Sequence, residues 1–249
     1  MENMSKLIKT IEILRSENGC AWDREQTHYS LRQNMLEEAY EAVDAINAND
    51  MKHLKEELGD VLLQVVLHSQ IASEENEFNL DDVAKGINEK LIERHPHVFG
   101  DIKTDDVNVI LDNWEKIKKE QKPHRKSVLD GISKSQSALM SAQKISKRAV
   151  KVGFEWQNLE QLKECIKSEF KEFESAKTEL NKEEEFGDIL FALVNLARWH
   201  NIDAEQALIK TNNKFQKRFR HMEANSSKDL EKLTFEEWEL LWKNAKKED

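Results

Sequence analysis

Four acidic residues in the first half of the chain stand in two pairs at helical spacing. Glu38 and Glu41 are three residues apart, and Glu57 and Asp60 repeat that spacing, which places each pair on one face of a helix. The pairs are symmetric about Asn49, so an antiparallel hairpin would bring the four carboxylates face to face. All-oxygen ligands favour a hard cation, Mg²⁺ or Mn²⁺, and Mg²⁺ completes its shell with water and substrate phosphates. The pattern therefore predicts a metal centre that suits a nucleotide substrate.

The second half of the chain repeats this arrangement. The matched segments are 19–22 with 153–156, 30–41 with 161–172, 56–63 with 184–191, and 88–94 with 212–218. The counterparts of the four carboxylates are Glu169, Glu172, Glu185 and Asp188. Segments that recur once and in the same order indicate two homologous domains rather than a short-period solenoid.

A solvated acidic face and a di-iron centre are the two other interpretations of the carboxylates. Acidic residues commonly form a solvated helix face that lysines support, but Glu38 and Glu41 have no lysine at the fitting spacing, and the motif is duplicated. A di-iron centre needs Glu-x-x-His motifs from two helices. That spacing occurs from Glu25 to His28, in a loop without a counterpart in the repeat. Core, capping or loop roles are expected for the histidines His68, His95 and His97.

Basic, amide and aromatic residues at matched positions could bind a nucleotide beside the metal. Lys90 precedes Arg94 by four residues, as Lys214 precedes Arg218, so each pair shares a helix face and could neutralise phosphate oxygens. Ordinary surface cations are the alternative for each pair. A tryptophan in each loop before an acidic helix could stack on a base or pack in a core. The predicted substrate-binding residues are Trp22, Arg32, Asn88, Lys90 and Arg94, and in the repeat Trp156, Lys163, Asn212, Lys214 and Arg218.

Long amphipathic helices must position these residues. Apolar spacing predicts helices over 4–14, 30–47, 51–73, 80–95, 105–121, 134–151, 158–179, 182–199, 203–224 and 234–246. The stretch from Val61 to Leu67 is apolar nearly all round, which is typical of a helix buried on most sides. Asn18-Gly19 suggests a left-handed cap after the first helix. Capping boxes are predicted at Ser30, Asp203 and Thr234.

Composition agrees with an all-α fold. Two prolines, seven glycines and 35% charged residues in 249 favour continuous helices over turn-rich β structure. The length allows one large domain or two of roughly 100 to 150 residues. The second proline, Gly131 and several serines lie between residues 122 and 137. We therefore predict two tandem homologous helical domains, 1–121 and 134–249, joined by a linker at 122–133.

Charge and cysteine usage limit the partners and the compartment. A net charge of −10 would repel a polyphosphate backbone, so nucleic-acid binding is not expected. Cys20 and Cys165 form no CxxC pair, which gives no support to a disulfide scaffold or a zinc site and favours a reducing cytoplasm. The beginning of the sequence has no leader-like pattern, and its apolar runs are too short to span a bilayer, so no membrane association is expected.

The acidic motif resembles the EExxE...ExxD signature of MazG-type nucleoside triphosphate pyrophosphohydrolases. Glu37-Glu-Ala-Tyr-Glu41 supplies the first part, and Glu57-Leu-Gly-Asp60 supplies the second. The likeness covers nearly the whole chain and includes the motifs Gly19–His28, Arg94–Asp101, Val152–Trp156 and Thr211–Phe215. It implies an all-α fold built on a four-helix bundle, a homodimer, and Mg²⁺-dependent hydrolysis of nucleoside triphosphates to the monophosphate and pyrophosphate. The implied role is removal of non-canonical or surplus nucleotides.

The resemblance also assigns roles to individual residues. The implied metal ligands are Glu38, Glu41, Glu57 and Asp60 in the first domain and Glu169, Glu172, Glu185 and Asp188 in the second. Glu41 and Glu172 are candidate bases for the attacking water. Ser168 stands at the position of Glu37, so the second domain is impaired if that glutamate activates water and intact if it lies outside the ligand shell. Lys163, Lys214 and Arg218 favour the second domain as the complete phosphate-binding set, but one or both domains could turn over.

A binding or adaptor protein is the alternative function class. In that case the duplicated carboxylates would hold a structural cation, and exposed helices would bind a partner. The apolar spacing of residues 228–249 allows this tail to pack on its own domain or on a second subunit. Metal-dependent release of pyrophosphate separates the enzyme from the adaptor.

Overall fold

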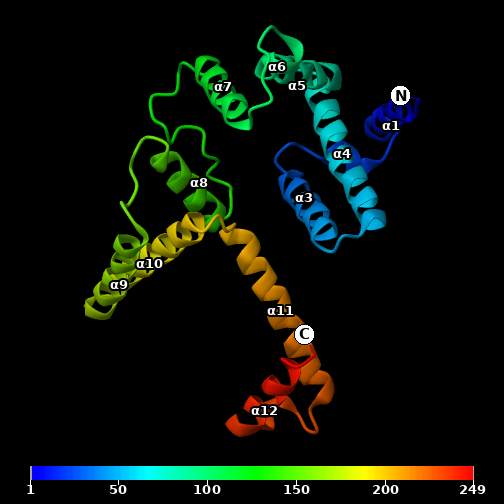
Figure 1. Ribbon diagram of the computed structural model, residues 1–249. Coiled ribbons are helices and arrows are strands. Elements are labelled where there is room, and N and C mark those ends of the chain that lie inside the picture. Colours follow the sequence, from blue (N-terminus) through cyan, green and yellow to red (C-terminus); the bar gives the residue numbers. More distant parts are fainter. Residues whose placement is uncertain (1, 249) are drawn as a thin grey trace. The chain divides into compact units, whose positions relative to one another are not determined.

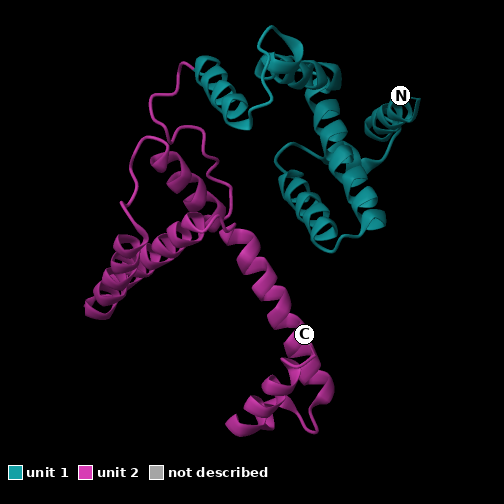
Figure 2. Cartoon of the chain, in the orientation of Figure 1, with its two compact units in different colours: residues 1–122 teal, residues 123–249 magenta. Residues whose placement is uncertain are grey.

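The computed structural model describes residues 2–248. Within that range every regular element is a helix, and no strand occurs (Figure 1). The chain divides into two compact units, residues 1–122 and residues 123–249 (Figure 2). The prediction of an all-α chain with two tandem helical domains is confirmed. None of the helices between residues 2 and 248 has the length and apolar character that crossing a membrane requires.

The first unit is organised around an antiparallel hairpin of two helices, α3 and α4. Its helices are α1 (Glu2–Arg15), α2 (Ala21–Glu25), α3 (Arg32–Asn47), α4 (Met51–Glu74), α5 (Leu80–Arg94), α6 (Pro96–Phe99) and α7 (Val107–Glu120). The hairpin turns at Asn49, whose φ of 54° lies in the left-handed region that asparagine tolerates. The Asp50 carboxylate then caps α4 by accepting from the main-chain N–H groups of Lys52 and His53, each at 3.0 Å. The short helices α2 and α6 are absent from the sequence-based prediction.

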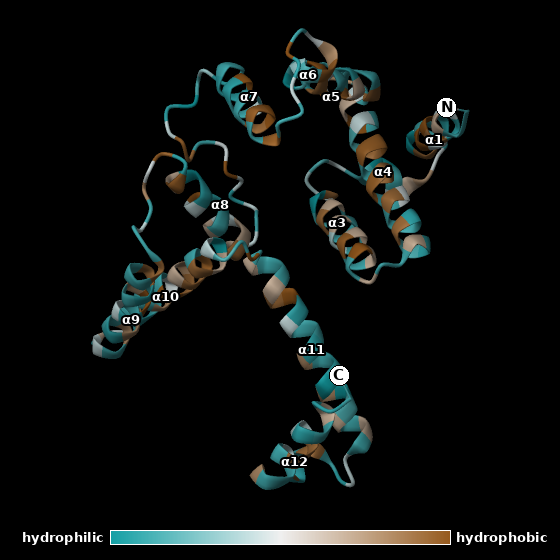
Figure 3. Ribbon diagram, viewed as in Figure 1, coloured by the Kyte–Doolittle hydropathy of each residue, from teal (hydrophilic) through white to brown (hydrophobic). Residues whose placement is uncertain are grey.

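The core of the first unit lies between α1 and the apolar part of α4, which Figure 3 shows in brown. Its buried members are Ile11, Leu31, Val66, Leu67 and Ile71. No residue from 61 to 67 is exposed, which confirms the expected burial of this helix on most sides. This packing holds α4 in place, so the acidic residues at its other end face α3 from a fixed element.

The second unit repeats the hairpin with α9 and α10, and α8 packs on α10. Its helices are α8 (Ala138–Val150), α9 (Leu159–Ser175), α10 (Glu179–Trp199), α11 (Ala204–Asn225) and α12 (Phe235–Ala245), with a 3-10 turn η1 at Leu230–Lys232. The Thr178 hydroxyl accepts from the N–H of Asn181 at 3.1 Å and caps α10. The predicted boundary between residues 179 and 182 is therefore wrong, because this cap starts α10 at Glu179 and α9 already ends at Ser175.

A buried polar network ties the loop that carries Trp156 to α8 and α10. The Arg198 guanidinium pairs with the Glu155 carboxylate at 2.6 Å and donates from Nε to the Ser146 hydroxyl at 2.6 Å. Ser146 in turn donates to Asn195, which lies on α10 with Arg198. Because buried charges and amides are costly without partners, this network fixes the course of the loop before α9.

Two of the predicted caps are wrong. Gly19 does not have a positive φ, so it forms no left-handed cap. Glycine is nevertheless required there, because a Cβ atom would stand 2.2 Å from the carbonyl oxygen of Ile13. Ser30 does not cap α3, which starts at Arg32. Its hydroxyl instead accepts from the N–H of Thr27 at 2.9 Å, within the loop. The capping box at Thr234 is confirmed, and Asp203 caps α11 through the N–H of Gln206 at 2.9 Å.

One prediction concerns the two leucines at matched positions near the start of the acidic helices. Leu31 and Leu162 are 1% and 0% exposed. Replacing Leu162 with alanine leaves a cavity, so we expect Leu162→Ala to lower the free energy of unfolding by about 2 to 5 kcal/mol. Denaturant titration measures this. The control Leu180→Ala, at a residue that is 65% exposed, should cost much less, and equal losses would contradict the packing described.

A histidine pair joins the loop before α3 to α4. The Nδ1 atoms of His28 and His68 lie 2.7 Å apart, and the two rings stack with an interplanar angle of 1°. One ring must be a neutral acceptor for this hydrogen bond to form. Burial, and then the charge of His28, lowers the pKa of His68.

The lowered pKa predicts a pH dependence of stability. Below about pH 6.5 the unfolded chain binds a proton at His68 more readily than the folded chain does, so the contribution of this residue is present above that pH and is lost as the pH falls. We expect the unfolding temperature to decrease from pH 7.5 to 5.5, and to decrease less in His68→Gln. His200→Gln, at an exposed histidine of the second unit, is the control. An unchanged slope in His68→Gln would exclude this role.

Candidate metal centre

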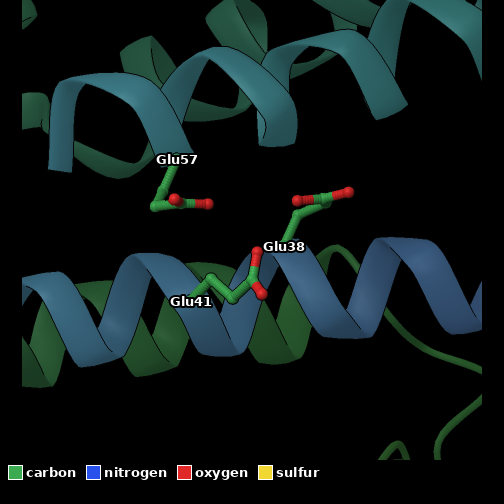
Figure 4. Close-up of side chains that lie close together, drawn as sticks. All are labelled: Glu38, Glu41 and Glu57. Atoms are coloured by element: carbon green, nitrogen blue, oxygen red, sulfur yellow. The ribbon is translucent and has the colours of Figure 1, made fainter. Parts of the chain in front are cut away.

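The α3–α4 hairpin brings together Glu38, Glu41 and Glu57. Each of these residues offers a carboxylate oxygen within 4.8 Å of those of the other two. In Figure 4, Glu38 extends from α3 toward α4, Glu57 extends from α4 toward α3, and Glu41 runs along α3 toward Glu38. Glu57 is only 6% exposed, Glu38 is half-buried and Glu41 is exposed. Three of the four predicted acidic residues thus converge as their spacing required.

The electrostatics of this first cluster favour a cation. Burial raises the pKa of Glu57, and the neighbouring Glu41 carboxylate adds to the effect. Burial and the charges of Asp60 and Glu41 likewise raise the pKa of Glu38. His53 acts in the opposite direction on Glu57, since its Nε2 lies 2.7 Å from Glu57 Oε1. Ionised carboxylates in this arrangement repel one another, and a positive charge among them would remove that repulsion.

The α9–α10 hairpin forms an equivalent second cluster from Glu169, Glu172 and Glu185, again with oxygens within 4.8 Å of one another. Burial, and then the charge of Glu172, raises the pKa of Glu185. Two donors lie beside this cluster. The Ser168 hydroxyl donates to Glu172 Oε1 at 2.9 Å, and the Cys165 thiol donates to Glu169 Oε1 at 3.5 Å.

Asp60 and Asp188 lie outside the two groups of converging oxygens. They remain electrostatic neighbours, because the charge of Asp60 raises the pKa of Glu38 and that of Asp188 raises the pKa of Glu185. The donor set of both clusters is made only of carboxylate oxygens, and such a set fits a hard divalent cation. The residues present therefore suit the metal that the sequence predicted.

Among the predicted phosphate-binding residues of the first unit, Arg94 has protein partners. Its guanidinium donates to Gln121 Oε1 at 3.0 and 2.8 Å and lies 5.4 Å from the ring of Trp114, so it joins α5 to α7. Asn88 and Lys90 are exposed on α5. The contacts of Arg94 are thus with α7 rather than with the carboxylates.

In the second unit, Arg218 lies 5.5 Å from the ring of Trp242, and its neighbours on α11, Asn212 and Lys214, are exposed. The Lys163 ammonium pairs with Glu160 at 2.7 Å on the surface of α9. The tail packs on its own unit, since Trp242 lies against Phe215 with ring centroids 5.4 Å apart. These cations stand on α9 and α11.

The residues predicted to stack on a base differ in their exposure. Trp22 is 59% exposed, so it is not a core residue. Trp156 is half-buried, and its main-chain N–H donates to Glu155 Oε1 at 3.0 Å. Arg32 lies 3.9 Å above the ring of Tyr29.

Sequence reasoning missed the polar partners of the carboxylates. His53 stands four residues before Glu57, and Ser168 stands four residues before Glu172. Residues at this spacing are neighbours on a helix, so the signal was present in the sequence.

Comparison with known proteins places the chain in a family. Residues 26–99 and 157–223 each match the MazG nucleotide pyrophosphohydrolase domain. The chain belongs to the MazG family. Each matched segment of this MazG chain contains one carboxylate cluster. The family resemblance predicted from the sequence is confirmed, and with it the prediction of a hydrolase.

Several relatives are similar over most of this MazG chain. It is 46% identical over 245 residues to the nucleoside triphosphate pyrophosphohydrolase/pyrophosphatase MazG of Thermotoga maritima, which covers 97% of this chain and 94% of the relative. It is 40% identical over 260 residues to the nucleoside triphosphate pyrophosphohydrolase of Escherichia coli K12, an alignment that covers 100% of this chain and 99% of that relative. It is also 48% identical over 244 residues to the uncharacterized protein YabN of Bacillus subtilis, covering 95% of this chain and half of that relative.

The repulsion within the second cluster leads to a prediction about cations and stability. Glu185→Gln removes one of the repelling charges, so we expect it to raise the unfolding temperature in chelator and to reduce the rise that Mg²⁺ produces. A cation present at one hundred times its dissociation constant stabilises a site by about 2.7 kcal/mol. Thermal unfolding with Mg²⁺ and with chelator measures both effects. Glu183→Gln, at an exposed residue of the same helix, is the control. A wild-type Mg²⁺ response in Glu185→Gln would exclude a cation at this cluster.

Proposed function

We propose that this MazG chain hydrolyses nucleoside triphosphates to the monophosphate and pyrophosphate with a divalent cation, Mg²⁺ or Mn²⁺. The observation that carries the proposal is the convergence of three glutamates from a helix hairpin, formed twice within the two matched domain segments. Further support comes from two near-full-length relatives that are named nucleoside triphosphate pyrophosphohydrolases. The proposed role is removal of surplus or non-canonical nucleotides in the cytoplasm.

The carboxylate clusters would hold the cation. The proposed ligands are Glu38, Glu41, Glu57 and Asp60 in the first unit, and Glu169, Glu172, Glu185 and Asp188 in the second. When bound, the cation supplies Lewis acidity toward the phosphate oxygens. Both helices of each hairpin would contribute carboxylate oxygens to it.

Glu41 and Glu172 are the proposed bases. Each is the exposed member of its cluster, so its carboxylate can accept a proton from the attacking water. The water oxygen forms a bond to the α-phosphorus as the bond from that phosphorus to the bridging oxygen breaks. Pyrophosphate then leaves with the electron pair of the broken bond, and the proton remains on the glutamate until solvent removes it.

Basic and amide residues of α5 and α11 would bind the phosphates, and aromatic residues would bind the base. Asn212, Lys214 and Arg218 follow one another on α11, with Asn88, Lys90 and Arg94 as their counterparts on α5. Trp22, Arg32, Trp156 and Lys163 complete the proposed substrate-binding set.

We also propose a homodimer. An apolar cavity of about 230 Å³ lies between α11 and α12, and Phe235, one of its lining residues, is 75% exposed. This exposed apolar surface supports a contact with a second copy of the chain.

The proposal predicts a specific pair of products. Wild type with Mg²⁺ should release equal amounts of monophosphate and pyrophosphate, and chelator should abolish the release. Glu57→Ala and Glu185→Ala each remove a proposed ligand from one cluster. Mutating a residue that only orients a metal ligand typically lowers activity roughly 10- to 100-fold, so the double variant should lose more turnover than that. Assays with the eight common ribo- and deoxyribonucleoside triphosphates measure this, and the single variants assign the working unit.

Matched controls lie next to the two mutated residues. Glu56 and Glu184 occupy equivalent exposed positions outside the clusters, so Glu56→Ala and Glu184→Ala should retain turnover. If no triphosphate yields pyrophosphate with Mg²⁺ or Mn²⁺, the enzyme proposal fails and the binding-protein alternative replaces it.

A further inference from the structure

The two carboxylate clusters differ one helical turn before their glutamates. Segment 161–172 aligns with segment 30–41, so Ser168 corresponds to Glu37 and Cys165 corresponds to Asn34. In the second unit, Ser168 donates a hydrogen bond to Glu172 Oε1 at 2.9 Å. Glu37 cannot make this bond when ionised, because a carboxylate is only an acceptor. The substitution therefore replaces a negative charge with a donor.

The Ser168 hydroxyl reaches only one of the two Glu172 oxygens. The other oxygen remains available to a cation, and Glu172 also belongs to the group whose oxygens converge within 4.8 Å. Glu172 is exposed, so without this bond its side chain would be free to take several rotamers. A hydrogen bond to a charged acceptor is stronger than a neutral one and restricts that freedom before any cation arrives.

Hydrogen bonds to a metal-binding carboxylate are a general means of orienting it. Residues that orient ligands in this way typically change metal affinity by 10- to 100-fold when they are mutated. At this one position the second cluster lacks a negative charge that the first cluster has, because serine replaces glutamate. Positioning can therefore compensate in part for weaker electrostatic attraction.

We propose that Ser168 is a positioning residue of the second cluster, whose hydroxyl holds the Glu172 carboxylate in the orientation that binds the divalent cation. This inference rests on the proposed function of the cluster as a metal site. Under this proposal the second centre keeps a functional group where the family signature has its first glutamate, with a hydrogen bond in place of a charge.

Manganese binding tests the inference without relying on turnover. The full-length chain with Glu57→Ala isolates the second cluster, and electron paramagnetic resonance of free Mn²⁺ gives its dissociation constant. In this background we expect Ser168→Ala to weaken Mn²⁺ binding about tenfold. Ser168→Thr keeps the hydroxyl and should restore the affinity. Because Ser168 is exposed on α9, alanine should leave the fold intact, which circular dichroism checks.

A second serine of α9 provides the matched control. The Ser175 hydroxyl donates to the main-chain oxygen of Glu172 at 3.0 Å and does not touch its carboxylate. Ser175→Ala should therefore bind Mn²⁺ like the parent chain, while a merely structural effect of losing a hydroxyl would weaken both alanine variants.

The outcomes separate this inference from the proposal on which it rests. Mn²⁺ binding that Glu185→Ala removes, but that Ser168→Ala leaves unchanged, would overturn the positioning role and keep the metal site. Absence of any Glu185-dependent Mn²⁺ binding would overturn the metal site and the positioning role together. A tenfold loss in Ser168→Ala that Ser168→Thr reverses would support both.

Discussion

Repulsion between carboxylates that a helix hairpin forces together is the interaction on which both units depend. Burial and neighbouring negative charge raise the pKa of Glu57 in one unit and of Glu185 in the other. Such an arrangement destabilises the folded state, and apolar packing elsewhere must offset that loss. In the first unit the stabilising packing comes from the middle of α4, where Val66 and Leu67 lie in the core with α1.

The hairpins solve this problem with the same local devices. A polar residue caps the second helix of each pair: Asp50 begins α4 and Thr178 begins α10. The cap fixes the first turn of that helix. It therefore also fixes the position along the helix axis at which the glutamate seven residues later, Glu57 or Glu185, meets the partner helix. A rigid turn at one end and a packed core toward the other hold the acidic residues in place between them.

The sequence contained enough information to predict the helices and the converging glutamates, because both depend on spacing within one hairpin. It was less informative where distant segments meet. The cap expected at Ser30 fails because that hydroxyl bonds within its own loop, and Gly19 is needed for its closeness to Ile13 rather than for its φ. Arg94 looked like a free phosphate ligand, yet it contacts Gln121 and Trp114, and spacing cannot reveal such long-range partners.

The division of the chain into two units has a consequence for how the protein tolerates change. Each hairpin has its own turn and its own caps, so a substitution at one acidic centre need not unfold the other. One of two homologous units in a chain can therefore change while the other keeps its structure. Serine at position 168, where the aligned position 37 of the first unit is glutamate, shows that the two acidic centres of this single polypeptide differ in the residue next to their ligands.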